Sequence, residues 1–211
     1  PYDILLNRDG GREGIEGLRE GAAVGTSSMR RGAQLRRVRP DLQILSLRGN
    51  LQTRLAKLDR GDFDAIVLAE AGLERMGLEM DYARLDAERF VPSANQGTII
   101  VVARKGTAAE QHSRALDHAP TRTETMIERR ILETVGGGCV VPMAVHACAS
   151  GGSARVLAEI LSLDGERFVR LDEKISLNDR PLDRAEDMGQ RLMNMGGREL
   201  VDEAVKKFGA R

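Results

Sequence analysis

The stretch AAVGTSSMRR, residues 22–31, decides the first part of the fold, because an apolar segment runs into a glycine, three hydroxyl residues and two arginines. A hydroxyl residue ahead of an amphipathic segment commonly caps a helix, so we predict a strand followed by a helix that runs to Pro40. Amides at a helix N-terminus attract anions, and a guanidinium can donate two hydrogen bonds to one carboxylate. This turn is therefore a predicted carboxylate site.

Two further strand-to-helix turns follow the same plan. The stretch LRGNLQTR, residues 47–54, follows a predicted strand over 42–47 and opens a helix that Gly61 ends. A third predicted strand, 65–69, leads through Glu70 into a short helix that closes at Gly77. Glu70 is expected to pair with Arg75 or Arg48, or to act as a capping or surface carboxylate.

In open α/β sheets the ligand lies beyond the carboxyl ends of the strands. The turns therefore predict one cleft that is lined by arginines, namely Arg30, Arg31, Arg48, Arg54 and Arg75. A solvated surface position is the better interpretation for any single arginine. That alternative weakens for the set, since the arginines recur at the turns rather than on the outer faces of the helices.

A second group of residues lies downstream. Residues 121–124, TRTE, are typical of a capping box that opens a helix, and this helix ends at GGGC, residues 136–139. Three glycines give little steric cover, so the thiol of Cys139 is expected to be accessible and, once deprotonated, nucleophilic. A lone cysteine is more often a small buried apolar residue, and Cys148, in a predicted strand over 144–149, fits that interpretation.

The rest of the chain predicts its organisation. Strands and helices alternate over 3–92, which indicates a parallel or mixed α/β lobe. A connecting segment, 93–118, holds a predicted strand over 98–103 and a helix over 107–118. A small α+β domain, 119–211, is expected to carry a three-stranded antiparallel sheet over 144–149, 154–163 and 166–176, with hairpin turns at 151–152 and 164–165. Two terminal helices should cover that sheet through Met188, Leu192, Met195, Val201, Ala204, Val205 and Phe208.

Composition disfavours several classes of protein. The 32 basic and 32 acidic residues balance, and the chain has four Phe, two Tyr and no Trp, so nucleic-acid binding through the basic stretch 30–39 is a weak alternative to a solvated helix face. We expect no membrane association, because no apolar segment approaches the length of a bilayer-crossing helix. The N-terminus lacks the residue order of a signal peptide, and two cysteines suit a reducing compartment, so a cytoplasmic location is expected.

Taken in order, the motifs resemble those of the porphobilinogen deaminases, also called hydroxymethylbilane synthases. The resemblance covers nearly the whole chain and rests on residues 25–31, residues 47–54, Ala71-Gly72-Leu73 with Arg75, Gln96-Gly97, and Gly137-Gly138-Cys139 with Pro142. It implies a periplasmic-binding-protein-like α/β lobe followed by a small α+β domain. It also implies a dipyrromethane cofactor joined to Cys139 by a thioether, onto which four porphobilinogen units are added before a linear tetrapyrrole and ammonia are released.

The resemblance assigns roles to individual residues. It implies catalytic roles for Arg48, Arg54 and Arg75. It implies cofactor contacts from Cys139, Thr26, Ser27, Ser28, Arg30, Arg31, Ala69, Gln96 and Gly97. No metal is expected, and the full-length protein is expected to be a monomer.

One departure from the family pattern has a large consequence. The family uses an aspartate in a Lys-Asp pair of its first lobe to stabilise positive charge on the pyrroles, and no matching segment occurs in these residues. We therefore expect that the chain lacks the first lobe and that, as given, it does not turn over. The main alternative is a non-catalytic two-lobed protein that binds carboxylates or other anions, and it would have no need of Cys139.

Overall fold

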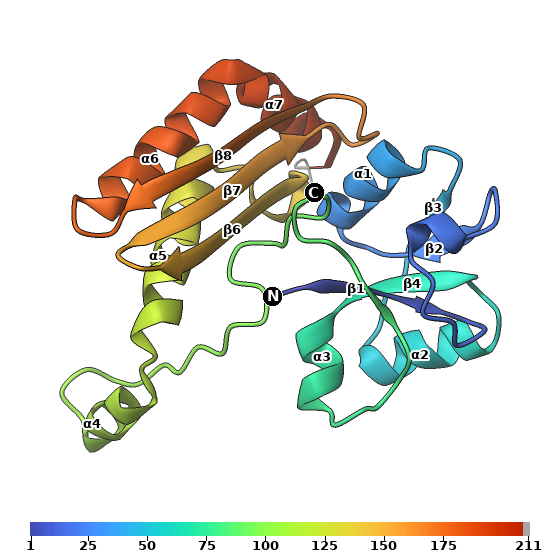
Figure 1. The fold of residues 1–211 in the computed structure, drawn as a ribbon, viewed down its shortest axis with the longest axis horizontal. Helices are drawn as coiled ribbons and strands as arrows, with labels where there is room; N and C mark the ends of the chain where they lie inside the picture. The colour runs from blue at the N-terminus through green and yellow to red at the C-terminus, as the bar shows by residue number, and fades with distance from the viewer. Residues whose placement is uncertain (209–211) are drawn as a thin grey trace.

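The structure is a computed structural model, and it describes residues 1–208. Two sheets, each with its own apolar core, divide the chain (Figure 1). The first sheet contains β1 (Asp3–Asn7), β2 (Ala23–Gly25), β3 (Gln43–Leu45), β4 (Ala65–Ala69) and β5 (Ala83–Arg84), in the order β3-β2-β4-β1-β5. Strand β2 pairs in parallel with β3 and β4, whereas β1 runs antiparallel to β4 and β5. The predicted mixed α/β lobe is confirmed.

Local sequence signals explain the helices of this lobe. They are the 3-10 turn η1 (Ile15–Gly17) and the helices α1 (Met29–Val38), α2 (Leu51–Asp59) and α3 (Glu70–Arg75). The Ser28 side chain accepts a hydrogen bond from the amide of Arg31, and the Asn50 side chain accepts one from the amide of Thr53. Each cap satisfies an amide that the helix itself leaves without a partner, which is why α1 and α2 begin where they do.

The strands of the first sheet separate two apolar layers. Leu5 and Val67 face one side, where they pack with Leu35 of α1, and Ile4 and Ile66 face the other, where Leu58 of α2 lies. Successive side chains of a strand point to opposite faces, so a continuous apolar strand requires cover on both. The helices supply that cover and hold the strand ends rigidly.

The connecting segment differs from its prediction. Residues 98–103 form no strand in the described structure, and the four apolar residues 99–102 are exposed, Val102 by 88%. A strand requires a neighbouring strand for its backbone hydrogen bonds, and none lies beside this segment within residues 1–208. The predicted helix over 107–118 is shorter, and consists of α4 (Ala108–Ser113) and the 3-10 turn η2 (Arg114–Leu116).

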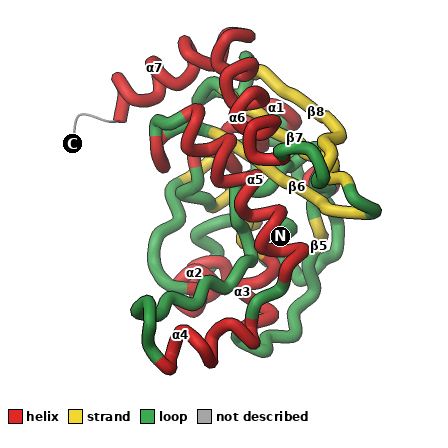
Figure 2. Tube along the Cα trace, turned by 90° about the vertical axis from the view of Figure 1, so that its left-hand side faces the viewer, coloured by secondary structure: helices red, strands yellow, loops and turns green. Residues whose placement is uncertain are grey.

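The second sheet follows the predicted antiparallel order β6-β7-β8. Its elements are α5 (Ala119–Val135), the 3-10 turn η3 (Gly138–Val140), β6 (Met143–Ser150), β7 (Ser153–Leu161), β8 (Phe168–Ser176), α6 (Pro181–Leu192), the π-helical turn η4 (Met193–Gly197) and α7 (Arg198–Phe208). Helices α5 and α6 pack together against one face of this sheet (Figure 2). Both predicted hairpin turns are confirmed, as is the fold class.

Several details of the second half were predicted wrongly. Helix α5 begins before the expected capping box, since Pro120 suits the first turn of a helix and the His118 ring accepts a hydrogen bond from the amide of Thr121. Glu124 instead accepts a hydrogen bond from the amide of Ala149 on β6. Cys148 is exposed, because it points away from the face of β6 that buries Ala147.

The terminal helices cover the sheet with fewer residues than expected. Met188, Leu192, Val201 and Ala204 are buried, but Met195 and Val205 are 52% and 38% exposed. The kink at Gly196, where φ is 112°, interrupts the helical periodicity and turns Met195 outward.

The two halves of the chain meet where the β7–β8 hairpin rests on α1. Gly165, at the tip of the hairpin, has a φ of +80°, and a Cβ there would lie 2.2 Å from the carbonyl oxygen of Ala33. Nearby, the fully buried carboxylate of Glu159 accepts hydrogen bonds from Gln34 at 2.8 Å and from Arg37 at 3.0 Å. Arg170 of β8 lies 3.4 Å from the same carboxylate. We call these four side chains, Gln34, Arg37, Glu159 and Arg170, the Glu159 cluster.

Within residues 1–208, no helix is both long enough and apolar enough to cross a membrane.

Candidate functional site

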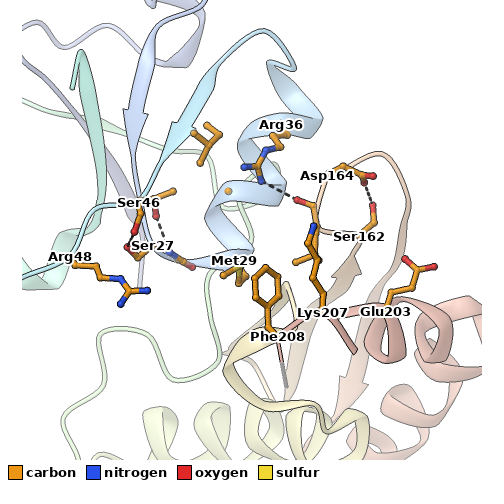
Figure 3. A pocket seen from close by; sticks show the side chains of 15 residues that line it. Ser27, Met29, Arg36, Ser46, Arg48, Ser162, Asp164, Glu203, Lys207 and Phe208 are labelled. Atoms are coloured by element: carbon orange, nitrogen blue, oxygen red, sulfur yellow. Dashed lines mark hydrogen bonds between the residues drawn. The ribbon is translucent and has the colours of Figure 1, made fainter. Parts of the chain in front are cut away.

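A hollow of about 600 Å³ lies between the α/β lobe of residues 3–92 and the C-terminal half of the chain. The α/β lobe lines it with the turn of Thr26, Ser27 and Ser28 and with Arg48. The C-terminal half lines it with the β7–β8 hairpin and with α7, and Figure 3 shows Lys207 and Phe208 facing this space across from Arg48. Two strand-to-helix turns that were predicted to act together therefore do open onto one space.

Hydrogen bonds fix the hydroxyl residues of this turn. Ser27 donates from its hydroxyl to the carbonyl oxygen of Leu47 at 2.8 Å, and its oxygen lies 3.1 Å from the hydroxyl of Ser46. Ser28 caps α1, and the Thr26 hydroxyl accepts a hydrogen bond from the amide of Ser28. The turn after β2 is thus tied to the turn after β3, and the N-terminus of α1 faces the hollow.

The charges around the hollow favour an anion. Arg48 is exposed, and its guanidinium makes no hydrogen bond or ion pair with any residue of the described chain. The two carboxylates of the hollow are already engaged: Asp164 accepts a hydrogen bond from Ser162, and Glu203 lies 2.5 Å from the guanidinium of Arg167. Arg48 and Lys207 therefore remain available to a negatively charged ligand.

Arg30 and Arg31 are not among the residues that line the hollow, and they surround a carboxylate, Asp3, that sequence reasoning missed. Arg30 is 4% exposed, and its terminal nitrogens contact Asp3 at 2.6 and 3.3 Å. Arg31 donates from Nε to the same carboxylate at 2.9 Å. Gln96 joins them, because its side-chain oxygen accepts from Arg30 at 3.0 Å and its side-chain nitrogen donates to Asp3 at 2.9 Å. We call these four side chains, Asp3, Arg30, Arg31 and Gln96, the Asp3 cluster.

Electrostatics in the Asp3 cluster favour the charged form of Asp3 but disfavour that of Arg31. Burial by itself would raise the pKa of Asp3, but the charges and hydrogen bonds of Arg30 and Arg31 hold it below its ordinary value. Burial lowers the pKa of Arg31, and the neighbouring positive charges of Arg30 and Arg54 act in the same direction. The sequence signal that could have revealed this cluster is Asp3 itself, a lone acidic residue at the start of the buried apolar strand β1.

The other predicted residues gather near this cluster. Arg75 donates to the carbonyl oxygen of Gly97 at 2.5 Å, next to Gln96. Arg54 donates to the carbonyl oxygen of Gly49 at 2.9 Å, and its charge reaches Arg31. Ala69 precedes α3 and pairs with Asp3 across the sheet. The predicted residues thus fall into two groups, the hollow and the Asp3 cluster, and α1 belongs to both.

Glu70 takes neither of its expected arginine partners. It accepts hydrogen bonds from Arg84 at 2.6 Å and from the Tyr82 hydroxyl at 2.7 Å. Strand β5 pairs with β1 and so brings Arg84 beside Glu70, which the local sequence did not show. Burial would raise the pKa of Glu70, but the hydrogen bonds from Arg84 and Tyr82 lower it.

Cys139 lies exposed in η3, as the glycine loop predicted. Residues 136–138 all have positive φ, and a Cβ on Gly137 would lie 2.3 Å from a methyl group of Val141, so that position requires glycine. The same Cβ would lie 3.1 Å from Val201, which shows how closely this loop packs on α7. Helix α7 also lines the hollow, and therefore the thiol and the hollow share one supporting element.

Among the described residues, no group of three or more His, Cys, Asp and Glu side chains is placed to hold a metal ion.

Comparison with known proteins assigns both halves of the chain to one enzyme family. The family model described as porphobilinogen deaminase, dipyrromethane cofactor binding domain, matches residues 1–112, and the model of the C-terminal domain matches residues 122–195. The probable porphobilinogen deaminases of Methanococcoides burtonii and Methanosarcina mazei are 48% and 46% identical over 207 residues, 97% of this chain. The porphobilinogen deaminase of Desulforudis audaxviator is 42% identical over 95% of the chain.

The chain spans 65% to 66% of the length of these three relatives, slightly less than two thirds. The matches cover both sheets, and they favour an enzyme family over a non-catalytic anion-binding protein. The chain belongs to the porphobilinogen deaminase family.

Proposed function

We propose that the full gene product is a porphobilinogen deaminase, which removes ammonia from porphobilinogen and joins four units head to tail onto a dipyrromethane held by Cys139, releasing hydroxymethylbilane. The observation that carries this proposal is the exposed thiol of Cys139 on a glycine loop that packs against α7, the helix that also lines the hollow. A binding protein has no use for a nucleophile in that position, whereas a covalently held cofactor requires one.

The residues present fit a dipyrromethane. Each pyrrole unit carries an acetate and a propionate, and the hollow offers donors that carboxylates bind, namely the hydroxyls of Thr26 and Ser28 and the amides at the N-terminus of α1. When bound, the group supplies the terminal pyrrole carbon onto which new units are added. We propose that eight residues hold the dipyrromethane or support the residues that hold it: Thr26, Ser27, Ser28, Arg30, Arg31, Ala69, Gln96 and Gly97.

Arg48, Arg54 and Arg75 are proposed to hold the carboxylates of the growing chain. All three are on the α/β lobe of residues 3–92, and Arg48 has no competing partner within the described residues. The growing product gains two carboxylates with each unit, so the number of cationic side chains required rises with chain length. Replacing Arg48 by Leu should therefore permit cofactor attachment but stall elongation.

Activity is proposed for the full gene product rather than for the 211 residues by themselves. A carboxylate must offset the positive charge that develops as ammonia leaves, and both carboxylates that line the hollow are engaged by other side chains. We propose that the 211-residue chain binds anions without releasing ammonia. A monomeric state is also proposed, as is a cytoplasmic location, which the two exposed free cysteines suit.

The test compares two cysteine variants of the full gene product, because both thiols are exposed. Intact-mass spectrometry of the wild-type protein should show an increment of two pyrrole units, and Ehrlich's reagent should develop pyrrole colour. Cys139→Ser should lose both signals, since a hydroxyl is a far weaker nucleophile than a thiolate at neutral pH. Cys148→Ser should keep both. Normal colour and turnover in Cys139→Ser would refute the proposal.

A further inference from the structure

One carboxylate holds both adjacent arginines of α1. Oδ2 of Asp3 accepts from Nη1 of Arg30 at 2.6 Å, and Oδ1 accepts from Nε of Arg31 at 2.9 Å. Asp3 is 1% exposed, so it cannot itself meet a ligand. We infer that Asp3 is a positioning residue, which neutralises Arg30 and orients the guanidinium of Arg31 for a carboxylate of the substrate or cofactor. This inference rests on the proposed function.

The two arginines differ in the donors that they have left. Arg30 is saturated at its terminal nitrogens, which also donate to Gln34 at 3.1 Å and to the carbonyl oxygen of Val91 at 2.8 Å. Its Nε is buried and has no hydrogen-bond partner among residues 1–208, and no ligand can reach it there. Arg30 is therefore fixed as part of the protein interior, and its charge is cancelled by Asp3.

Arg31 keeps one side of its guanidinium available. Nε and Nη2 both lie close to Oδ1 of Asp3, at 2.9 and 2.8 Å. The free side is that of Nη1, which makes a long hydrogen bond of 3.4 Å to the carbonyl oxygen of Val67, and the contact of Nη2 with Gln96 is equally long. Long hydrogen bonds are weak, so an ionised carboxylate would displace them. Since the cluster holds two guanidiniums and one carboxylate, its formal charge is one positive unit, and Arg31 is the side chain that presents it.

The position of Asp3 on the sheet explains why its carboxylate can hold both arginines. Asp3 pairs with Ala69 at the end of β4, beside the turn into α3, and α1 begins after the parallel strand β2. The arginines are thus held from the sheet, which is rigid, rather than from a loop. Gln96 adds a neutral partner for all three charged groups.

The first experiment measures hydrogen exchange at Arg side chains by NMR in the full gene product. The Nε–H of Arg31, assigned by its loss in Arg31→Lys, should exchange at least about tenfold more slowly than that of exposed Arg48, because a hydrogen-bonded proton exchanges only when the bond opens. This comparison needs no change at Asp3. Equal exchange at Arg31 and Arg48 overturns the inference, whether or not a variant at Asp3 folds.

The second experiment measures porphobilinogen binding by calorimetry in a Cys139→Ser background, which prevents turnover. Asp3→Asn should weaken binding by about tenfold or more and should abolish the slow exchange of Arg31, because an uncharged amide holds a guanidinium poorly. The matched control is Asp81→Asn, which removes the same charge from an exposed pair with Arg12. The control should bind as the parent does.

The outcomes separate this inference from the proposed function. If the parent protein does not bind porphobilinogen, the proposed function fails, and the role of Asp3 toward that ligand fails with it. If the parent binds and folded Asp3→Asn binds equally well, only the role of Asp3 is overturned. Loss of binding in Asp3→Asn together with unchanged slow exchange at Arg31 also overturns it, since the arginine would then be held by something else.

Discussion

Replacing Glu159 by Gln should weaken the junction between the two halves of the chain. The change keeps the shape of the side chain but removes the negative charge that Arg37 and Arg170 share at 3.0 and 3.4 Å. Breaking a buried ion pair typically costs about 3–5 kcal/mol. The side chains of Arg37 and Arg170 are 17% and 25% exposed and can recover some hydration, so we expect roughly 2–3 kcal/mol.

The assay is urea unfolding of the 211-residue chain at neutral pH, followed by circular dichroism. The matched control is Glu186→Gln, which makes the same change in a pair with Arg130 whose side chains are 53% and 42% exposed. Exposed pairs contribute about 0–1 kcal/mol, so the control should unfold almost as the parent does. A loss in Glu159→Gln no larger than that in the control would refute the view that this carboxylate joins the two halves.

Three further predictions concern single positions. Gly165→Ala should lower the melting temperature far more than Gly151→Ala. A Cβ at 165 would lie 2.2 Å from the Ala33 carbonyl oxygen, whereas a Cβ at 151 would meet no atom of the described residues within 4 Å. Equal losses would contradict the docking of the hairpin on α1. Folding lowers the pKa of Asp3, so the contribution of Asp3 to stability is present above about pH 3.9 and is lost as the pH falls through the lower folded value. The difference in urea stability between the parent and Asp3→Asn should therefore shrink below about pH 4. A difference that grows in acid would contradict this role of Asp3. Val102→Asp should change the stability of the 211-residue chain by less than about 0.5 kcal/mol, because the residue is 88% exposed, and urea unfolding that shows a larger loss would mean that residues 99–102 are packed in solution.

Signals that act over a few residues predicted the fold well. A hydroxyl residue was expected to cap the first helix, and Ser28 does so. The two hairpin turns lie at the predicted Gly-Gly and Asp-Gly pairs. In each case the residue that signals the structure also makes the contact that stabilises it. Such features can be predicted because both partners of the stabilising contact lie within a few residues of each other.

Contacts across the chain escaped prediction. Asp3 meets Arg30 and Arg31 only because β1 lies beside β4, and Glu159 meets Arg37 only because the hairpin rests on α1. The sequence shows an acidic residue within an apolar strand in both cases, which signals a buried partner without naming it. The arginine-rich turns were predicted, but Arg30 is drawn away from the hollow by Asp3, which is distant in sequence.

The place of β1 in the sheet has a consequence for synthesis on the ribosome. During synthesis β1 must wait for β4, since Asp3 pairs with Ala69, and Arg30 must wait longer for Val91 and Gln96. Contacts between residues so far apart in sequence form slowly, and an apolar strand without its partner is prone to aggregate. A nascent chain that stalls before residue 69 would therefore expose Ile4, Leu5 and Leu6, which makes this lobe a natural client for chaperones that bind short apolar segments.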